Sequence, residues 1–410
     1  MFKLTTLTRV AAIGAVMALA ACSSDKKLLG PTNLVGGDIF KSYVAMGNSI
    51  TAGYQSGGIV DSTQRQSYAF LLASRMGTQY HYASLRSPGC PAPIVNFNTQ
   101  ARPTGAPPCA LRNASSITDI LNNVAVPGAS SYDPTAINGT PFSNALTTFI
   151  LGGKTQVARA LDANPTFVSI GIVGNDYLSF AVQDGRTAAL ANITPVATFT
   201  ANYDATIAAL LAGAPNVKGV IMANALPTNV PILFAAAAMS DPTFKALFDA
   251  QAGVTTTLDP SCVAGGAGAN SLINTFLAHQ IRAGAHPPIV ACVAGGASGA
   301  LPAPIGDILI LDPAEQVTIN TIVNGYNAYL QNKATAIGFA FYDLNPLLTS
   351  LKAAGTVIRS TPNYASPTAP FGPGMSLDGV HPALPVHRLL ANDLIGVINT
   401  KYGTSLTPVP

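Results

Sequence analysis

The chain has 410 residues, of which 48% are apolar and only 10% are Asp, Glu, Lys or Arg. Soluble domains usually carry about 25% charged residues, and disordered chains need high charge with low hydrophobicity, so this composition excludes a disordered protein. The 21 basic against 18 acidic residues lack the surplus typical of a nucleic-acid-binding protein, while the mean hydropathy of +0.35 raises a membrane protein as the first alternative.

Residues 1–21 predict an export signal. Basic residues precede the apolar run Val10–Ala21, which is too short to span a bilayer but suits the hydrophobic part of a signal peptide. Small residues, then Cys22 and a polar segment, resemble the lipobox of bacterial lipoproteins. That resemblance implies cleavage before Cys22 and its acylation, so that residues 22–40 would tether an exported chain to a membrane. An ordinary signal peptide with an incidental cysteine is the alternative.

The position after the cysteine bears on which membrane is meant. An Asp there would suggest retention in the inner membrane of a Gram-negative cell, whereas this chain has Ser23. We therefore expect an exported lipoprotein, with the outer membrane or cell surface favoured.

Beyond the signal, short apolar runs alternate with helical patterns. The most apolar remaining stretch, Val217–Met239, is interrupted by Lys, Asn and Pro, so it predicts a buried strand that runs into a loop and not a membrane span. Helical spacing occurs at residues 203–211, after the cap-like Asp312-Pro313, and at residues 386–398. Buried strands are predicted at Tyr43–Met46, Val124–Val126, Phe167–Ile172, Val217–Met222 and Phe339–Tyr342.

This alternation predicts one α/β domain over residues 41–410: a flavodoxin-like three-layer α/β/α sandwich with a central parallel sheet. In such sheets the functional residues gather at the carboxyl ends of the strands. Two loop-rich insertions interrupt the pattern, at about residues 87–116, which hold six prolines, and 223–311, which hold only six charged residues. We expect the charge-poor insertion to be either a substrate-binding lid or buried bulk.

Four cysteines remain besides Cys22. An even number in an exported protein predicts two disulfides, and four cysteines allow three pairings. We favour Cys90–Cys109 and Cys262–Cys292, because each pair brackets a Gly/Pro-rich stretch. The chain has no CxxC or HExxH motif and no His/Cys cluster with zinc spacing, so we expect no metal.

Two distant motifs could together perform nucleophilic chemistry. Ser49 follows the first predicted strand in a Gly-flanked turn, where a hydroxyl is exposed and neighbouring N–H groups can bind an oxyanion. Asp378 precedes His381 by three residues, which lets the carboxylate accept from one imidazole nitrogen while the other faces a nucleophile. Taken singly, the first motif also fits an ordinary turn serine, and the second a capping Asp beside a surface His.

Two further positions could stabilise an oxyanion. Asn175 follows the strand Phe167–Ile172 and can donate a neutral N–H, and Gly128 follows the strand Val124–Val126, where the backbone N–H is accessible. Each by itself also fits a simple turn.

In chain order these motifs resemble the SGNH/GDSL hydrolase family, which is matched at Gly47-Asn48-Ser49-Ile50, Gly128, Gly174-Asn175-Asp176 and Asp378-Gly379-Val380-His381. The resemblance implies that Ser49 is the nucleophile, His381 the general base and Asp378 its orienting partner. It also implies an oxyanion hole of the Ser49 and Gly128 N–H groups with the Asn175 side chain, and no cofactor. Asn48 replaces the family's usual Asp, a change that we expect to tune the turn.

We therefore expect a lipid-anchored serine esterase or lipase whose substrate is an apolar small-molecule or lipid ester. One alternative is a carbohydrate O-acetylesterase acting on polysaccharide, which the lack of Trp disfavours. Another is a surface lipoprotein that binds without turnover. We expect neither nucleic acid nor metal as partner. Structural roles are expected for His81, His279, His286 and His387.

Overall fold

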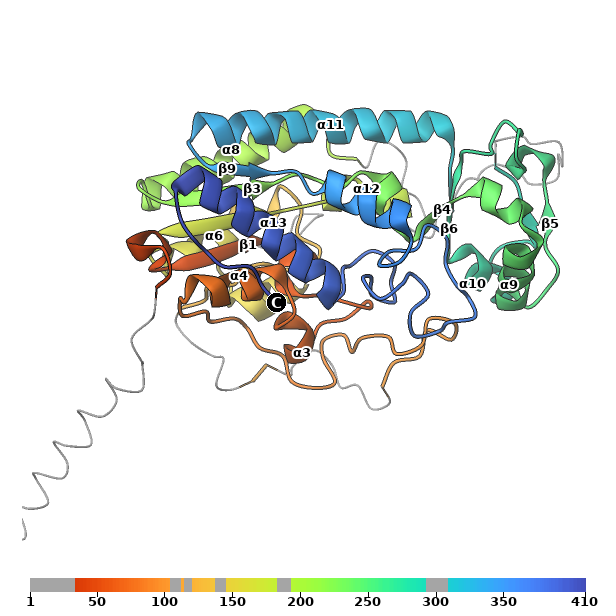
Figure 1. The fold of residues 1–410 in the computed structure, drawn as a ribbon, viewed down its shortest axis with the longest axis horizontal. Coiled ribbons are helices and arrows are strands. Elements are labelled where there is room, and N and C mark those ends of the chain that lie inside the picture. The colour runs from red at the N-terminus through yellow and green to blue at the C-terminus, as the bar shows by residue number, and fades with distance from the viewer. Residues whose placement is uncertain (1–33, 104–111, 114–119, 137–144, 183–192, 293–308) are drawn as a thin grey trace, which may run out of the picture.

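The computed structural model describes residues 34–103, 112–113, 120–136, 145–182, 193–292 and 309–410 (Figure 1). Its centre is a parallel sheet in the order β1-β2-β3-β9. Four of the predicted runs form these strands, each with one bound that differs by a single residue: β1 (Tyr43–Gly47), β2 (Phe167–Gly171), β3 (Lys218–Met222) and β9 (Ala340–Tyr342).

The predicted strand Val124–Val126 is irregular in the structure. It runs beside β1, where the Val124 N–H donates to Ala45 O at 2.9 Å and the Val126 N–H to Gly47 O at 3.1 Å, but only Asn123 forms a β-bridge with Ala45. The Asn123 side chain bonds to the Thr51 carbonyl and the Ala125 N–H, and such local side-chain bonds compete with a regular ladder. Counting this segment as second in the chain, the spatial order is 2-1-3-4-5, the flavodoxin-like order.

Helices cover both faces of the sheet (Figure 1). On one face lie α8 (Val196–Gly213) and α11 (Pro313–Ala336), which pack against each other; on the other lie α4 (Tyr68–Met76) and α13 (Leu384–Tyr402). Alternate residues of β1 enter different cores, with Tyr43 and Ala45 on the α4/α13 side and Val44 and Met46 on the α8/α11 side. Burial on both faces explains why the strands are continuously apolar.

The predicted helix start at residue 312 is confirmed. The Asp312 carboxylate accepts from the Glu315 N–H at 2.8 Å, and the Glu315 carboxylate accepts from the Asp312 N–H at 2.9 Å, which makes a capping box. Within the described ranges no helix combines the length and hydropathy needed to cross a bilayer. The other helices of the framework are α2 (Ser49–Ala52), α3 (Asp61–Gln64), α5 (Ala145–Leu151), α6 (Gln156–Leu161), α7 (Asn175–Val182) and α12 (Asn345–Ala354), with 3-10 turns at Gly37–Phe40, Asp133–Thr135 and Pro227–Asn229.

The second insertion carries more regular structure than its composition suggested. In Figure 1 it lies at one end of the molecule, and its apolar side chains, such as Phe244 and Phe248, are buried in the same core as α4 and α13. The packing of these side chains fits buried bulk, the second of the two expectations for this insertion. Its elements are β4 (Leu233–Ala235), β5 (Thr257–Leu258), β6 (Leu272–Asn274), β7 (Ile289–Val290), β8 (Ile310–Leu311), α9 (Pro242–Ala252) and α10 (Leu277–Arg282), with 3-10 turns at Ala236–Ser240 and Pro260–Cys262.

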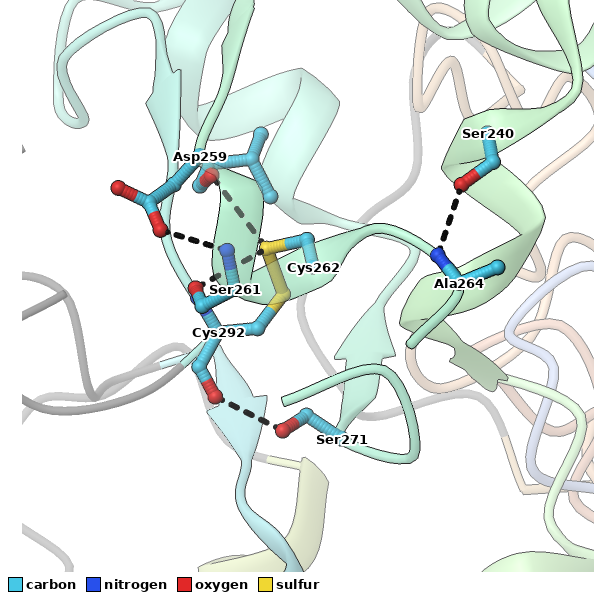
Figure 2. Close-up of a disulfide and its surroundings, with 8 residues drawn as sticks. Ser240, Asp259, Ser261, Cys262, Ala264, Ser271 and Cys292 are labelled. Carbon is cyan, nitrogen blue, oxygen red and sulfur yellow. Dashed lines mark hydrogen bonds between the residues drawn. A yellow bond between two sulfur atoms is a disulfide. The ribbon is translucent and has the colours of Figure 1, made fainter. Parts of the chain in front are cut away.

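One of the expected disulfides braces this insertion. Cys262 and Cys292 are joined by an S–S bond of 2.05 Å, and the Ser261 hydroxyl accepts from the Cys292 N–H at 3.1 Å beside it (Figure 2). Cys90 is buried and also disulfide-bonded. Its expected partner, Cys109, lies outside the described residues, so that pairing stays a prediction.

The two insertions touch each other. Phe97 of the first insertion packs edge-on against the His279 ring with centroids 5.0 Å apart, and its carbonyl lies 3.0 Å from His279 Nε2. Residues 87–103 form no helix or strand among the residues described. The contact gives the proline-rich segment a fixed place on the α/β framework.

Candidate active site

The structure brings together the three residues that the two distant motifs singled out. Ser49 is the first residue of α2, directly after β1, and its Oγ lies 2.8 Å from His381 Nε2, although 332 residues separate the two. The other ring nitrogen, His381 Nδ1, lies 2.8 Å from Asp378 Oδ2. Serine, imidazole and carboxylate therefore form a continuous hydrogen-bonded chain.

Asp378 is held in place by five donors. Oδ2 accepts from the Gly57 N–H at 2.7 Å and from His381 Nδ1 at 2.8 Å. Oδ1 accepts from the Ser376 hydroxyl and from the Val380 and His381 N–H groups, each at 2.9 Å. Burial by itself would raise the pKa of this carboxyl, but the imidazole charge and these hydrogen bonds together lower the pKa well below its usual value.

The carboxylate decides the tautomer of the histidine. An ionised carboxylate can only accept, so His381 carries its proton on Nδ1 and presents the Nε2 lone pair to Ser49. This is the protonation state that can take a proton from a serine hydroxyl.

Two residues that the sequence motifs did not indicate complete this arrangement. Tyr54 packs against the His381 ring with centroids 4.9 Å apart, and its N–H donates to the Ser49 carbonyl at 2.9 Å. Burial, and then the charge of Asp378, raise the pKa of Tyr54 to about 12, so the phenol stays neutral. The second residue, Gly57, acts through its backbone. Neither carries a sequence signal, because both come close to Asp378 only through folding.

The two expected oxyanion donors lie on neighbouring turns. Gly128 has a φ of +85°, a left-handed conformation that favours glycine, and it follows the segment bonded to the end of β1. Asn175 begins α7 directly after β2, and its Nδ2 donates to the Ala129 carbonyl at 2.8 Å. Because a carboxamide has two N–H donors, this bond leaves Asn175 able to serve a second acceptor.

Asp176, the residue after Asn175, also binds the turn that carries Gly128. The Asp176 carboxylate accepts from the Ser131 N–H at 2.9 Å and from its hydroxyl at 2.6 Å. Burial raises the pKa of Asp176 and the two bonds from Ser131 lower it, with burial the larger effect. Asn175 and Asp176 therefore clamp the turn that carries Gly128.

A family model described as GDSL-like Lipase/Acylhydrolase matches residues 43–394, most of the chain. The chain belongs to this family. The match spans Ser49, Gly128, Asn175, Asp378 and His381, and it agrees with the parallel sheet and the helices on both of its faces. Membership of this family implies that the chain is an ester-hydrolysing enzyme.

Solved structures similar to this chain come from the same group. An extracellular lipase from Streptomyces rimosus is 15% identical, with a TM-score of 0.37 over 88% of this chain and 99% of the lipase. A phospholipase A1 from Streptomyces albidoflavus is also 15% identical, with a TM-score of 0.32 over 90% and 99%. A family two carbohydrate esterase from Clostridium thermocellum is 11% identical, with a TM-score of 0.36 over 88% and 64%. No curated protein matches the chain.

Asn48, where this family member departs from the usual Asp, links the two halves of the site. Its fully buried Nδ2 donates to the Val173 carbonyl at 2.7 Å, and the N–H of Gly174, from the same peptide group, donates to Asn224 Oδ1 at 2.8 Å. Two buried amides thus hold the peptide that precedes Asn175. A carboxylate could not make the first of these bonds, since it has no hydrogen to donate.

The remaining histidines lie outside this chain of hydrogen bonds. His387 is fully buried, and its Nδ1 accepts from the Tyr68 N–H at 3.2 Å, which joins α13 to the start of α4. Burial, with a smaller effect of the nearby His381, lowers the pKa of His387 to about 3, so it stays neutral. Across the described part of the chain no cluster of three or more His, Cys, Asp or Glu side chains could hold a metal ion.

Proposed function

We propose that the chain is a serine esterase that hydrolyses carboxylic esters through Ser49, His381 and Asp378. The observation that supports this most strongly is the pair of 2.8 Å contacts that joins Ser49 Oγ to His381 and His381 to Asp378. A serine hydroxyl is a weak nucleophile by itself, and an oriented imidazole base is what activates it.

In the proposed reaction Ser49 Oγ attacks the ester carbonyl while its proton passes to His381 Nε2. The resulting oxyanion accepts hydrogen bonds from the Ser49 and Gly128 N–H groups and from the Asn175 amide. Loss of one such donor typically costs about 3 to 4 kcal/mol of transition-state stabilisation. Asp378 holds the ring and stabilises the imidazolium that forms.

His381 then gives its proton to the alcohol oxygen as the C–O bond breaks, which leaves an acyl-enzyme on Ser49. A water molecule next loses a proton to His381 Nε2 and attacks the acyl carbon. Collapse of the second tetrahedral intermediate returns the proton to Ser49 Oγ and releases the carboxylic acid. No cofactor takes part in these steps.

The proposal includes export and anchoring through lipid on Cys22. Its support is the sequence of residues 1–27 alone: an apolar run of signal length, small residues, Cys22 and then a polar tether. Cys22→Ser should release the protein from the membrane fraction, with the outer membrane or cell surface as the expected location of the wild-type chain. Membrane association that survives Cys22→Ser would contradict the anchor.

Purified protein would be assayed on nitrophenyl esters and on acetylated xylan, with Ser49→Ala as the test variant. Ser74→Ala is the matched control, because Ser74 is an exposed serine on α4. We expect ester hydrolysis by the wild type and by Ser74→Ala, and almost none by Ser49→Ala. A fluorophosphonate probe should label Ser49 alone, as read by peptide mass spectrometry. Turnover by Ser49→Ala equal to wild type would refute the mechanism.

The same assay separates the alternatives. A preference for acetylated xylan over every simple ester would favour a carbohydrate O-acetylesterase. Binding to esters or glycans without any turnover would instead point to a surface-binding lipoprotein.

A further inference from the structure

An apolar cavity of about 40 Å³ lies at the carboxyl end of the sheet, and its lining includes chain neighbours of the proposed catalytic residues. Its walls come from several separate parts of the chain: α2, the turn after β2, the end of β3 with the start of the second insertion, the β9–α12 connection with α12, the loop that carries His381, and α13. The cavity therefore exists only because the fold brings these parts together.

Two residues that line the cavity are the chain neighbours of Ser49 and His381. Ile50 directly follows Ser49, and Val380 directly precedes His381. Both of these wall residues are partly exposed, whereas Met222 and Leu390, which also line the cavity, are buried. The cavity is thus bounded by residues bonded directly to Ser49 and His381 in the chain and by residues of the core.

The residues that line the cavity favour a hydrocarbon chain over a polar group as its occupant. Ile, Val, Leu and Met side chains make up most of the wall. Asn229 also lines it, but its Nδ2 donates to Asn345 Oδ1 at 3.1 Å and its Oδ1 accepts from Thr349 at 3.0 Å. A sugar hydroxyl placed against the alkyl walls would lose its hydrogen bonds to water, which is unfavourable, while an acyl chain would lose nothing.

We propose that this cavity is the acyl-binding subsite of the site described above and that it restricts the substrate to short-chain esters. This inference rests on the proposed serine esterase function. A cavity of about 150 Å³ holds the six carbons of benzene, which is roughly 25 Å³ per carbon, so this cavity takes about one to three carbons. With the carbonyl carbon held at Ser49, the favoured acyl groups have about two to four carbons.

Two substitutions change the cavity in opposite directions. Leu348→Ala removes three carbons from the wall contributed by α12 and enlarges the cavity. Ala225→Leu adds three carbons at a partly exposed wall position and reduces the cavity. Leu347→Ala is the matched control, since Leu347 neighbours Leu348 on α12 and packs against the core without lining the cavity.

The experiment measures kcat/KM of the full chain on nitrophenyl acetate, butyrate, hexanoate and octanoate. For the wild type we expect the maximum at or below butyrate and a fall of at least about tenfold by octanoate, because a single methylene in an apolar pocket changes rates by about tenfold or more. Leu348→Ala should raise the hexanoate-to-butyrate ratio by about tenfold, and Ala225→Leu should lower the butyrate-to-acetate ratio by a similar factor. Leu347→Ala should leave both ratios within about twofold of wild type, as expected when no pocket contact changes.

The outcomes separate the subsite from the mechanism. If octanoate is hydrolysed as fast as butyrate, or if Leu348→Ala and Ala225→Leu both leave the chain-length profile at that of Leu347→Ala, the subsite is wrong while the esterase stands. If no ester is hydrolysed, or if Ser49→Ala retains wild-type activity, the proposed function itself fails. Should Leu348→Ala not fold, as judged by circular dichroism, Ala225→Leu still decides the question.

Discussion

Replacing Asp378 by Asn tests the central claim about the proposed base. Five donors converge on this carboxylate, and an amide of the same shape offers one acceptor oxygen and one NH₂ group. If the NH₂ takes the place of Oδ2, it faces the Gly57 N–H and the His381 ring. If it takes the place of Oδ1, it faces the Val380 and His381 N–H groups. In either orientation the NH₂ group, which can only donate, faces at least two other hydrogen-bond donors.

The first orientation also reverses the histidine tautomer. His381 Nδ1 would have to accept from the amide, so Nε2 would carry the proton and could not take one from Ser49. Loss of the correct tautomer costs a Ser-His-Asp enzyme about 10⁴ in kcat. At about 1.36 kcal/mol per tenfold change in rate, this is about 5.4 kcal/mol of transition-state stabilisation.

A smaller effect on stability should accompany the loss of activity. The pKa of Asp378 is lower in the folded than in the unfolded state, so the carboxylate contributes stability above the unfolded pKa of about 3.9, and this contribution is lost as the pH falls through the folded pKa. The variant should therefore be less stable than wild type at pH 7, with a difference that shrinks below pH 4.

The assay is kcat and KM on nitrophenyl butyrate, with thermal unfolding at pH 7 and pH 3.5. Ser376→Ala is the matched control, because it removes one of the five donors without placing a donor against another. We expect it to lose no more than about 150-fold in kcat, because one hydrogen bond to a charged group contributes about 1.5 to 3 kcal/mol. If Asp378→Asn keeps kcat within tenfold of wild type, or loses no more than Ser376→Ala, the tautomer argument is refuted.

Three further substitutions test the framework around the site. Asn48→Asp would bury a carboxyl against the Val173 carbonyl and raise the pKa of that carboxyl. The stability of the variant relative to wild type should therefore fall by up to about 1.4 kcal/mol per pH unit above pH 4. A stability difference that stays constant from pH 4 to 8 would contradict this. Replacing both Cys262 and Cys292 by Ser opens a link across 30 residues and should cost about 3 to 4 kcal/mol in denaturant unfolding, and a loss under 1 kcal/mol would show that packing alone holds the insertion. Burial lowers the pKa of Lys352 to about 8. Between pH 8 and 10 the unfolded chain therefore binds a proton that the folded chain has lost, and stability should rise with pH over that range. Lys352→Met should remove this rise, and a rise of equal size in the variant would assign it to another group.

Much of the framework was predictable because local signals and global fold agree. Continuous apolar runs between helical patterns predicted β1, β2, β3 and β9, and Asp312 with Pro313 predicted the start of α11. The fifth run, Val124–Val126, was wrong as a regular strand, since the side chain of Asn123 competes for the backbone there. Composition left open whether the second insertion is a lid or buried bulk, because helices and short strands built from Ala, Gly and Thr carry few charges whether packed or not.

The chain by itself determined which residue types were available and where the strands end. Ser49 and Asn175 follow buried strands, and the carboxyl ends of parallel strands meet at one edge, so a common site was predictable before any distance was known. The spacing of Asp378 and His381 is likewise local, and their 2.8 Å contact needs only one turn.

Only the tertiary structure decided what surrounds those residues. The Gly57 N–H on Asp378, the Tyr54 ring on His381 and the walls of the acyl cavity all depend on segments that are distant in sequence. Backbone N–H groups carry no sequence signal for such roles because nearly every residue has one, and apolar side chains carry none because they occur throughout the core. Their positions are set by packing of the whole chain, and packing also sets the length of ester that this site can accept.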